Sequence, residues 1–328
     1  MLAGKVLLEK VYLALQSIPE LNIKLDEPLC NHTRFVLGGA ALVFAETANE
    51  IAFTKALQVV RASGTRHVVL GGGTNLIVAD RGYCGVVLRY IADGIRHRGN
   101  HVQVDAGAEL NNLVDSLNAA GLKGLETLAG IPGWAGAAVY GNAGAYGHSI
   151  SERVESVRFF DGSDIRELNS TQCEFRYRES IFKRQKEWVI FSIDLLLTPA
   201  NSDELEATSA GIRKIRDEKF PPTMMCAGSI FKNILLRDLP ESVALQVPSN
   251  VVREGKIPAA WFLEQVGAKG TIHGGIRVAD YHANLIYNTG RGTATELCEV
   301  IADLKARVYA RFVLHLQEEV QYVGFDDD

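Results

Sequence analysis

The chain has few of the features that mark disulfide-stabilised or metal-binding proteins. Its 328 residues include five scattered cysteines and no C-x-x-C pair, so the sequence predicts neither a disulfide framework nor a zinc site. We expect the cysteines to be small buried hydrophobic residues. Only His97 and His101 have the H-x-x-x-H spacing, and the Gly99-Asn100 turn between them predicts surface positions instead of a metal pair.

Long apolar runs and a charge excess of one sign are also missing. No run approaches the roughly 20 residues that a membrane span needs, and 34 basic against 39 acidic residues give a net charge of -5. This balance does not suggest a nucleic-acid or membrane partner. The first 16 residues are apolar but interrupted by charges, which is typical of an amphipathic helix and not of a signal peptide. Its predicted apolar face consists of Leu7, Leu8, Val11, Tyr12 and Leu15. We therefore expect a cytoplasmic protein without metal.

The most informative stretch that is present lies at residues 68–80. A β-branched apolar run ends in Gly71, Gly72 and Gly73, and Thr74 and Asn75 lead into a second apolar run that begins at Leu76. The pattern predicts a strand, a tight loop and another strand. Glycine loops turn backbone N–H groups toward anions, so this loop is a candidate cradle for a pyrophosphate. Leu76 stands where a Rossmann fingerprint needs a small residue, and no P-loop lysine follows. An ordinary hairpin is the alternative.

A second stretch, at residues 130–147, contains six glycines and five alanines. Small residues at this density allow a close approach of backbone to backbone or of backbone to a flat ligand. A tightly packed core helix is the alternative. We favour a ligand, because two such segments occur in one chain.

The remaining pattern predicts two regions that meet near residues 199–202. In the first we expect strands at 42–45, 86–88, 101–105, 154–160 and 188–197, with helices at 50–61 and 110–120. Ser202 is expected to cap a helix that runs to about Glu218. In the second, smaller region we expect strands at 227–233, 282–287 and 313–323 and helices at 259–266 and 293–311.

Four polar residues stand among apolar or small neighbours: Arg178, Ser229, Lys232 and Glu319. Each alone is compatible with a surface charge or a turn hydroxyl. Together with the glycine stretches they match a family. The chain resembles the UDP-N-acetylenolpyruvoylglucosamine reductases (UDP-N-acetylmuramate dehydrogenases) from about residue 32 to residue 324. The matching segments are GGGTNLIV (71–78), GIPG (130–133), NAGAYG (142–147), YRESIFK (177–183), AGSIFKN (227–233) and EEVQYVG (318–324).

The resemblance implies an α+β fold. It consists of an FAD-binding domain of the p-cresol methylhydroxylase (PCMH) type at 26–200, after an N-terminal helical segment at 1–25, and a smaller α/β substrate-binding domain at 201–328. It also implies non-covalent FAD and NADPH as co-substrate. The residues implied to bind FAD are Gly71, Gly72, Gly73, Thr74, Asn75, Leu76, Ile131, Pro132, Gly133, Gly136, Ala137, Asn142, Gly144 and Ala145.

The reaction implied by the resemblance is the reduction of UDP-N-acetylglucosamine enolpyruvate to UDP-N-acetylmuramate for peptidoglycan. Ser229 is implied as proton donor, Arg178 as the contact of the enolpyruvyl carboxylate and Glu319 as its partner. The residues implied to bind the UDP-sugar are Tyr177, Lys219, Asn233 and His282. The alternatives are another oxidoreductase or oxidase on the same FAD-binding fold, and a nucleotide-binding module without activity.

The chain departs from the family pattern at a few positions. Val36 stands where an arginine is common, Trp134 replaces a usually small residue, and Gly141 replaces a larger one. Ile234 replaces a common proline. These differences concern the shape of the expected flavin pocket. The connection at 198–212 is too short for the inserted loop of one subclass, so the chain resembles the loop-less subclass.

Overall fold

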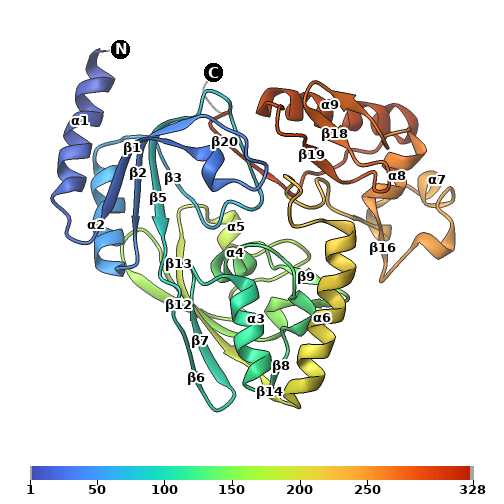
Figure 1. Ribbon diagram of the computed structural model, residues 1–328, viewed down its shortest axis with the longest axis horizontal. Helices are drawn as coiled ribbons and strands as arrows, with labels where there is room; N and C mark the ends of the chain where they lie inside the picture. The colour runs from blue at the N-terminus through green and yellow to red at the C-terminus, as the bar shows by residue number, and fades with distance from the viewer. Residues whose placement is uncertain (1, 326–328) are drawn as a thin grey trace. The chain divides into compact units, whose positions relative to one another are not determined.

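The computed structural model describes residues 2–325, which form two compact units (Figure 1). The first unit contains the described parts of Met1–Glu27, Ala41–Gly73 and Tyr83–Glu218, and the second those of Pro28–Ala40, Thr74–Gly82 and Lys219–Asp328. The chain therefore leaves the first unit directly after the third glycine of the glycine loop. The predicted roles of segments 1–25, 26–200 and 201–328 stay predictions.

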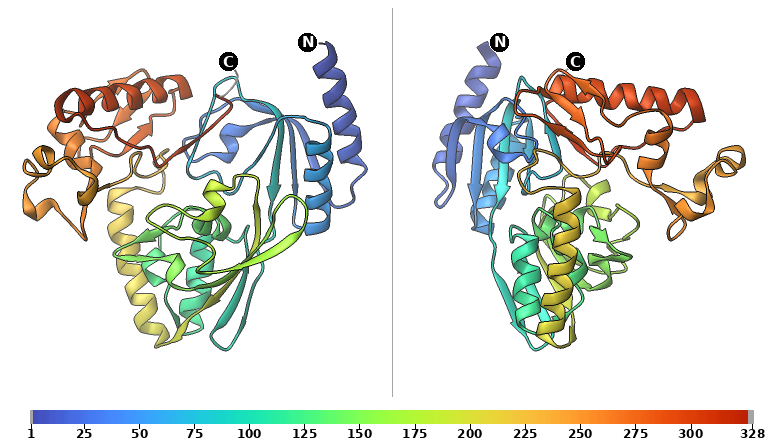
Figure 2. Two further views of the ribbon diagram at one scale, coloured as in Figure 1. Left: turned by 180° about the vertical axis from the view of Figure 1, so that it is seen from behind. Right: turned by 45° about the vertical axis from the view of Figure 1, so that its right-hand side comes forward.

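The first unit begins with two helices and a four-stranded sheet. The sheet order is β1 (Asn22–Pro28), β2 (Ala40–Thr47), β5 (Tyr83–Tyr90) and β3 (His67–Val69), with β2 and β3 parallel to β5. Helices α1 (Leu2–Gln16) and α2 (Glu50–Ala62) lie beside one another (Figure 2). Val11 and Leu15 are buried, as the apolar pattern predicts, whereas the side chain of Leu7 lies outside the described residues. The Asn49 side chain caps α2 by accepting two backbone N–H groups.

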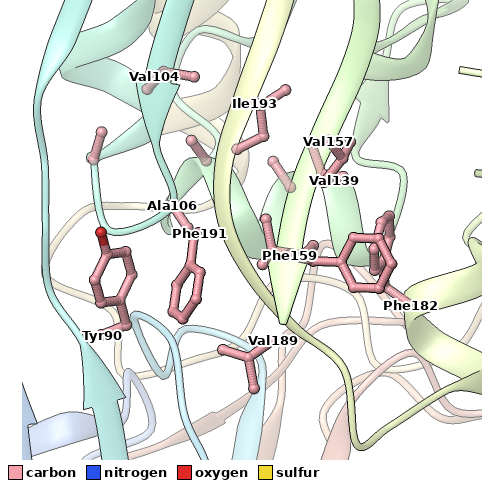
Figure 3. Packing of buried hydrophobic residues seen from close by; sticks show 14 of the residues in the cluster. Tyr90, Val104, Ala106, Val139, Val157, Phe159, Phe182, Val189, Phe191 and Ile193 are labelled. Carbon is pink, nitrogen blue, oxygen red and sulfur yellow. The ribbon is translucent and has the colours of Figure 1, made fainter. Parts of the chain in front are cut away.

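A five-stranded antiparallel sheet forms the rest of this unit, in the order β12 (Ile165–Asn169), β11 (Val154–Phe160), β13 (Val189–Leu196), β7 (His101–Asp105) and β6 (Ile95–Arg98). Val104, Ile193 and Val157 lie opposite one another on three adjacent strands and are buried. Helix α4 (Ala135–Tyr140) packs against β7 and β13 through this apolar face, and α3 (Leu110–Ala119) belongs to the same core (Figure 3).

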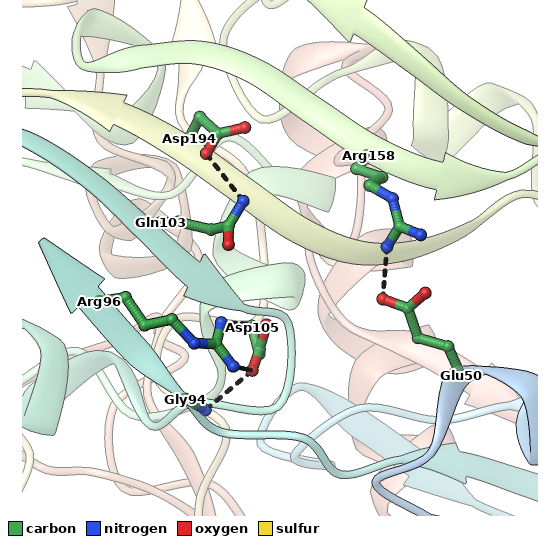
Figure 4. Close-up of polar contacts among 7 residues, drawn as sticks. All are labelled: Glu50, Gly94, Arg96, Gln103, Asp105, Arg158 and Asp194. Carbon is green, nitrogen blue, oxygen red and sulfur yellow. Dashed lines mark hydrogen bonds and ion pairs between the residues drawn. The ribbon is translucent and has the colours of Figure 1, made fainter.

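Polar side chains occupy other positions of the same sheet. Gln103 on β7 donates to Asp194 on β13 at 3.2 Å, and Arg96 on β6 pairs with Asp105 (Figure 4). The alternation predicted for 101–105 is therefore confirmed. His97 and His101 are exposed beside the β6–β7 turn, where Gly99 has a φ of 62°, so their predicted surface positions are confirmed as well.

Helix α6 (Ser202–Lys219) follows the pairing of β8 (Leu122–Lys123) with β14 (Thr198–Pro199). The predicted Ser202 cap is wrong by one residue, because the Asn201 side chain accepts the Glu204 N–H at 3.2 Å. Short 3₁₀ turns occur in both units. Those of the first unit are Glu126–Leu128 and Ile150–Glu152, and those of the second are Leu29–His32, Leu236–Asp238 and Ser249–Val251.

The second unit is built around one long-range strand pairing, one local antiparallel sheet and two helices. Strand β4 (Leu76–Val78) is parallel to β20 (Gln321–Val323), and β17 (Ile272–His273), β18 (Ile276–Val278) and β19 (Ile286–Asn288) form an antiparallel sheet. Helices α8 (Ala259–Gln265) and α9 (Ala294–Phe312) pack through Phe262 and Phe312, whose ring centroids are 5.2 Å apart. Strands β15 (Ile234–Leu235) and β16 (Lys256–Ile257) form an antiparallel pair, and the segment that connects them contains α7 (Glu241–Ala244).

Three predicted strands of this unit are wrong or too long. Segment 227–233 makes only isolated bridges, Ser229 with Leu285 and Phe231 with Glu318. The strand expected at 282–287 is regular only as β19, and the one expected at 313–323 only as β20. The cause at 227–233 is a side chain: the Asn284 amide bonds both the N–H and the carbonyl oxygen of Phe231 and takes the place of a regular ladder.

The cysteines are all free, and their burial differs. Cys173 and Cys226 are buried, whereas Cys84 is exposed, so the expectation of burial is wrong for Cys84. Burial raises the pKa of the Cys173 thiol to about 12. Within residues 2–325, no helix has the length and apolar character needed to cross a bilayer.

Candidate functional site

The glycine loop has the strand–loop–strand form that the sequence predicts. Strand β3 ends at Val69, Leu70 donates its N–H to the Leu88 carbonyl oxygen at 2.9 Å, and β4 begins at Leu76. Gly73 has a φ of 68°, in the left-handed region that glycine adopts most readily. Gly71 and Gly72 do not have such a φ, so their backbone conformation does not require glycine.

Trp134 limits the space beside Gly72. A Cβ atom on Gly72 would lie 3.0 Å from the indole Cδ1, whereas one on Gly71 would have ordinary contacts with Ala137 at 3.7 Å and Trp134 at 3.9 Å. The two glycine-rich stretches therefore touch, as the sequence interpretation requires. The Arg89 guanidinium lies 4.6 Å from the Trp134 ring centroid. Burial lowers the pKa of Arg89, with Glu46 acting in the opposite direction.

The second stretch is fixed to the start of α3. Asn111 accepts the Gly130 N–H at 2.7 Å and donates to the Ile131 carbonyl at 3.1 Å. The N–H groups of Ala135 and Gly136 donate to the carbonyls of Ala108 and Ala106. A Cβ atom on Gly136 would lie 2.7 Å from that of Ala106, so only glycine fits there. The segment that contains Ile131, Pro132, Gly133, Gly136 and Ala137 is thus held by backbone contacts.

After α4 the chain forms a hairpin of β9 (Gly144–Ala145) and β10 (His148–Ser149). Tyr146 and Gly147 both have positive φ, as a type I′ turn requires. Asn142, which precedes the hairpin, is 7% exposed, and its Nδ2 donates to the Arg176 carbonyl at 2.9 Å. Its Oδ1 is buried and has no hydrogen-bond partner among the described residues. A buried acceptor in this state suits a ligand that brings an N–H donor.

Arg178 lies in a tight turn next to this hairpin. Arg176 and Glu179 exchange backbone hydrogen bonds at 3.0 and 3.1 Å, which leaves Tyr177 and Arg178 at the turn, where Arg178 has a φ of 57°. Both terminal nitrogens of the Arg178 guanidinium donate to the Gly144 carbonyl at 3.2 Å. The short helix α5 (Ile181–Arg184) begins after Ser180, which is buried and donates to the Tyr140 carbonyl at 2.7 Å. Arg178 and Tyr177 therefore share one rigid corner with Asn142 and Gly144.

The second unit brings Ser229 and Glu319 onto neighbouring segments. Glu319 donates its N–H to the carbonyl of Ile230, the residue after Ser229, at 2.7 Å. Ser229 itself bridges Leu285, and the buried Asn284 holds Phe231 from the other side. Glu318, the neighbour of Glu319, forms a 2.7 Å ion pair with Lys305 of α9. Both predicted catalytic residues of this unit therefore lie on backbone that several segments fix.

Thr74, Asn75 and Leu76 belong to this second unit, although the sequence groups them with the glycines. The Asn75 side chain donates to the Glu319 carbonyl oxygen at 2.8 Å, and its own carbonyl accepts the Gln321 N–H at 3.0 Å. Asp80, two residues beyond the end of β4, anchors the chain again by accepting the N–H groups of Ala294 and Thr295 at the start of α9. Strand β4 is thus tied to the segment 318–320 that contains Glu319 (the Glu319 segment), to β20 and to α9.

Lys219, Phe220 and His282 lie in contact. The Lys219 ammonium is 5.2 Å from the Phe220 ring centroid, and that ring is 5.9 Å from the His282 ring. Burial, reinforced by Lys219, lowers the pKa of His282 to about 4. His282 is therefore neutral at pH 7. Its Nδ1 accepts the Asn284 N–H at 3.1 Å, so the proton sits on Nε2.

Asn233, the last predicted contact of the UDP-sugar, lies elsewhere in the second unit. Its side chain accepts the Ala259 N–H at the start of α8 at 3.3 Å.

Sequence reasoning did not assign a role to two residues that shape these corners. Lys183 donates to the Arg178 carbonyl oxygen at 2.9 Å. It stands five residues after Arg178 in the YRESIFK segment, and this short separation was the available clue in the sequence. Asn284 bonds Phe231, two residues after Ser229, from 53 residues along the chain, and no local pattern marks it.

Two family models and several known proteins match this chain. One family model, described as an FAD binding domain, matches residues 39–164, and another, described as the C-terminal domain of UDP-N-acetylenolpyruvoylglucosamine reductase, matches residues 220–323. The reductase of that name from Solibacter usitatus is 63% identical over 310 residues, which cover 94% of this chain and 99% of the relative. The one from Anoxybacillus flavithermus is 33% identical and covers 92% and 94%.

The fold has a solved counterpart. The crystal structure of UDP-N-acetylenolpyruvylglucosamine reductase from Thermus caldophilus matches with a TM-score of 0.70 and 26% identity, and covers 92% of this chain and 98% of that one. The predicted α+β fold with a PCMH-type FAD-binding domain is confirmed. The chain belongs to the UDP-N-acetylenolpyruvoylglucosamine reductase family.

Proposed function

We propose that this chain is an FAD-dependent oxidoreductase that reduces UDP-N-acetylglucosamine enolpyruvate to UDP-N-acetylmuramate with NADPH, a step of peptidoglycan synthesis in the cytoplasm. Support comes from the names of its relatives, which match over nearly the full chain. The observation that carries the proposal is the adjacency of Ser229 and Glu319, joined by the Glu319–Ile230 hydrogen bond, in a chain that also carries the glycine loop.

The residues of the first unit fit FAD. Gly71 leaves space at the loop where a side chain would otherwise stand, and the Asn142 Oδ1 is a buried acceptor still open to a donor from a ligand. The residues of this unit proposed to hold FAD are Gly71–Gly73 at the pyrophosphate, with Ile131–Gly133, Gly136–Ala137, Asn142 and Gly144–Ala145 along the rest. The family resemblance adds the backbone of Thr74–Leu76, which belongs to the second unit, to the pyrophosphate contacts. When bound, FAD takes a hydride from NADPH and delivers it to the enolpyruvyl group.

Arg178 and Glu319 act on the carboxylate end of the substrate. Hydride arrival at the terminal carbon builds enolate charge on the carboxylate side. A guanidinium offers a planar pair of donors to such a group, and its effect is strongest where water is excluded. The turn that holds Arg178 at positive φ fixes the direction of this side chain before substrate arrives. Glu319 is proposed to act with Arg178 on this end of the substrate.

Ser229 supplies the proton. Once the enolate has formed, the carbon next to the one that received the hydride needs a proton. The Ser229 hydroxyl is positioned to donate it. The remaining residues bind the UDP-sugar. The Lys219 ammonium faces a phosphate, the neutral His282 offers its Nε2–H as a donor, and Tyr177 and Asn233 contact the rest of the nucleotide sugar.

An anaerobic titration of the purified holoprotein tests this function. NADPH should bleach the yellow colour, and UDP-N-acetylglucosamine enolpyruvate should restore it with one equivalent of product. An oxidase on the same fold would instead consume oxygen with small alcohols and would not respond to the enolpyruvyl compound. A nucleotide-binding module would be colourless. Either result would refute the proposal.

A further inference from the structure

Asn75 makes contacts that a cofactor-binding residue does not need. Its side-chain amide donates to the Glu319 carbonyl oxygen at 2.8 Å, across 244 residues of sequence. Its backbone carbonyl accepts the Gln321 N–H at 3.0 Å, and the next residue, Leu76, pairs with Gln321 in the parallel ladder of β4 and β20. The amide group of Asn75 is therefore directed at the segment that contains Glu319, just before β20.

The backbone of Glu319 is consequently held on both sides. Its N–H donates to the Ile230 carbonyl at 2.7 Å, next to Ser229, and its carbonyl accepts from Asn75. These two bonds fix the peptide units that flank the Glu319 Cα atom, and so fix the direction in which its side chain leaves the strand. β20 begins only at Gln321, so no regular ladder holds Glu319 itself.

An asparagine is well suited to this position. Its Nδ2 is a neutral donor on a short stem, and the partner is a carbonyl oxygen that only a donor can satisfy. An aspartate of the same shape would place a carboxylate oxygen against that carbonyl, and an alanine would leave the carbonyl without this donor, so both changes should release the Glu319 backbone.

We propose that Asn75 is a positioning residue for Glu319. It sets the orientation of Glu319 through the Glu319 backbone, within the second unit. This inference rests on the proposed role of Glu319. It separates Asn75 from its glycine neighbours: the glycines serve the cofactor, and the Asn75 side chain serves the reacting end of the substrate.

Stopped-flow flavin absorbance on the holoprotein tests the inference with N75A, N75D, E319Q and the double variant N75A/E319Q. N75A leaves the backbone N–H of residue 75 in place for the FAD pyrophosphate, so it should retain FAD and be bleached by NADPH at the wild-type rate. Its limiting rate of reoxidation by the enolpyruvyl substrate should fall by about 10- to 10²-fold, as a misplaced catalytic group does, while the substrate Kd changes little. N75D, which differs little in shape, should show the same pattern and guards against a packing defect in N75A.

The double variant tests most directly whether Asn75 acts through Glu319. If Asn75 acts only through Glu319, N75A/E319Q should reoxidise no more slowly than E319Q, within about twofold. N288A is the matched control. The buried Asn288 amide likewise donates to a backbone carbonyl, but that carbonyl belongs to Phe35, at 3.0 Å, and not to Glu319. N288A should lose stability and keep the wild-type reoxidation rate.

Contrary outcomes separate the inference from its premise. If E319Q is slow but N75A is as fast as wild type, or if the two losses multiply in the double variant, Asn75 does not position Glu319. If N75A and N288A slow both half-reactions alike, Asn75 has only a structural role. If E319Q itself reoxidises at the wild-type rate, the role of Glu319 fails and the inference falls with it.

Discussion

Lys183 donates a hydrogen bond from its ammonium group to the Arg178 carbonyl oxygen at 2.9 Å. Arg178 has a φ of 57°, a conformation that costs an L residue free energy unless its surroundings enforce it. The Lys183 side chain is 18% exposed and also forms a 3.5 Å ion pair with Glu179. A largely buried charge therefore holds the peptide unit that follows Arg178 and keeps the turn in its left-handed form.

Replacing Lys183 with methionine should weaken this hold while the alkyl packing is preserved. We expect K183M to retain FAD, to be reduced by NADPH normally and to be reoxidised by the enolpyruvyl substrate about tenfold more slowly, because the Arg178 guanidinium is less well oriented. Stopped-flow absorbance measures both rates. K186M, on the exposed residue Lys186 three positions along, is the control and should behave as wild type. A wild-type reoxidation rate in K183M would exclude this role.

The charge on Arg178 is not sufficient by itself. R178K keeps the positive charge but loses the planar pair of donors, so its limiting rate of reoxidation should fall by about 10²-fold or more. The substrate Kd should rise by much less, because the enolate charge develops only on the way to the transition state. Rates measured across substrate concentrations separate the two quantities. Equal losses in both would mean that Arg178 contributes ground-state binding alone.

The glycine loop is tested best at Gly71. A Cβ atom there would make only ordinary contacts in the protein, and Gly71 has no positive φ, so G71A should fold with nearly wild-type stability. If the pyrophosphate of FAD approaches this backbone, the added methyl group should still lower FAD affinity strongly. Isothermal titration of the apoprotein with FAD measures this. G211A, in α6 with open space around its Cβ position, is the control and should bind FAD normally. Equal FAD affinity in G71A and G211A would move the pyrophosphate elsewhere.

The low pKa of His282 predicts a pH dependence of stability. Burial and Lys219 lower this pKa from 6.5 to about 4, while Glu264 opposes the shift and Lys269 adds to it. Between these values the unfolded chain binds the proton that the folded chain rejects, so the free energy of unfolding should fall as the pH drops from about 6.5 to about 4.

Urea denaturation across this pH range checks the effect. H282Q cannot titrate, so the difference in unfolding free energy between wild type and H282Q should shrink steadily below pH 6.5 and stay constant above it. A difference that does not vary with pH would contradict the low pKa.

Regular elements could be predicted from sequence where the local pattern determines the structure. The alternation at 101–105 and the helices expected at 50–61 and 293–311 depend on residues within one or two turns of each other. The segments around Ser229 and Glu319 could not, because their hydrogen bonds come from the Asn284 and Asn75 side chains and from single bridges. Such long-range pairings leave no periodic pattern. The identities of Ser229, Arg178 and Glu319 came from family resemblance alone.

The central claim is that Ser229 gives the proton in the second half-reaction and has no part in the first. S229A should bind FAD, bleach with NADPH at nearly the wild-type rate and bind the enolpyruvyl substrate. Its reoxidation should slow by roughly 10²- to 10⁴-fold, the usual effect of losing a general acid. Anaerobic stopped-flow absorbance of the flavin, with NADPH in one mixing and the enolpyruvyl substrate in the next, records both halves on one sample. Equal slowing of both halves, or no slowing of either, would contradict the assignment of the proton to Ser229.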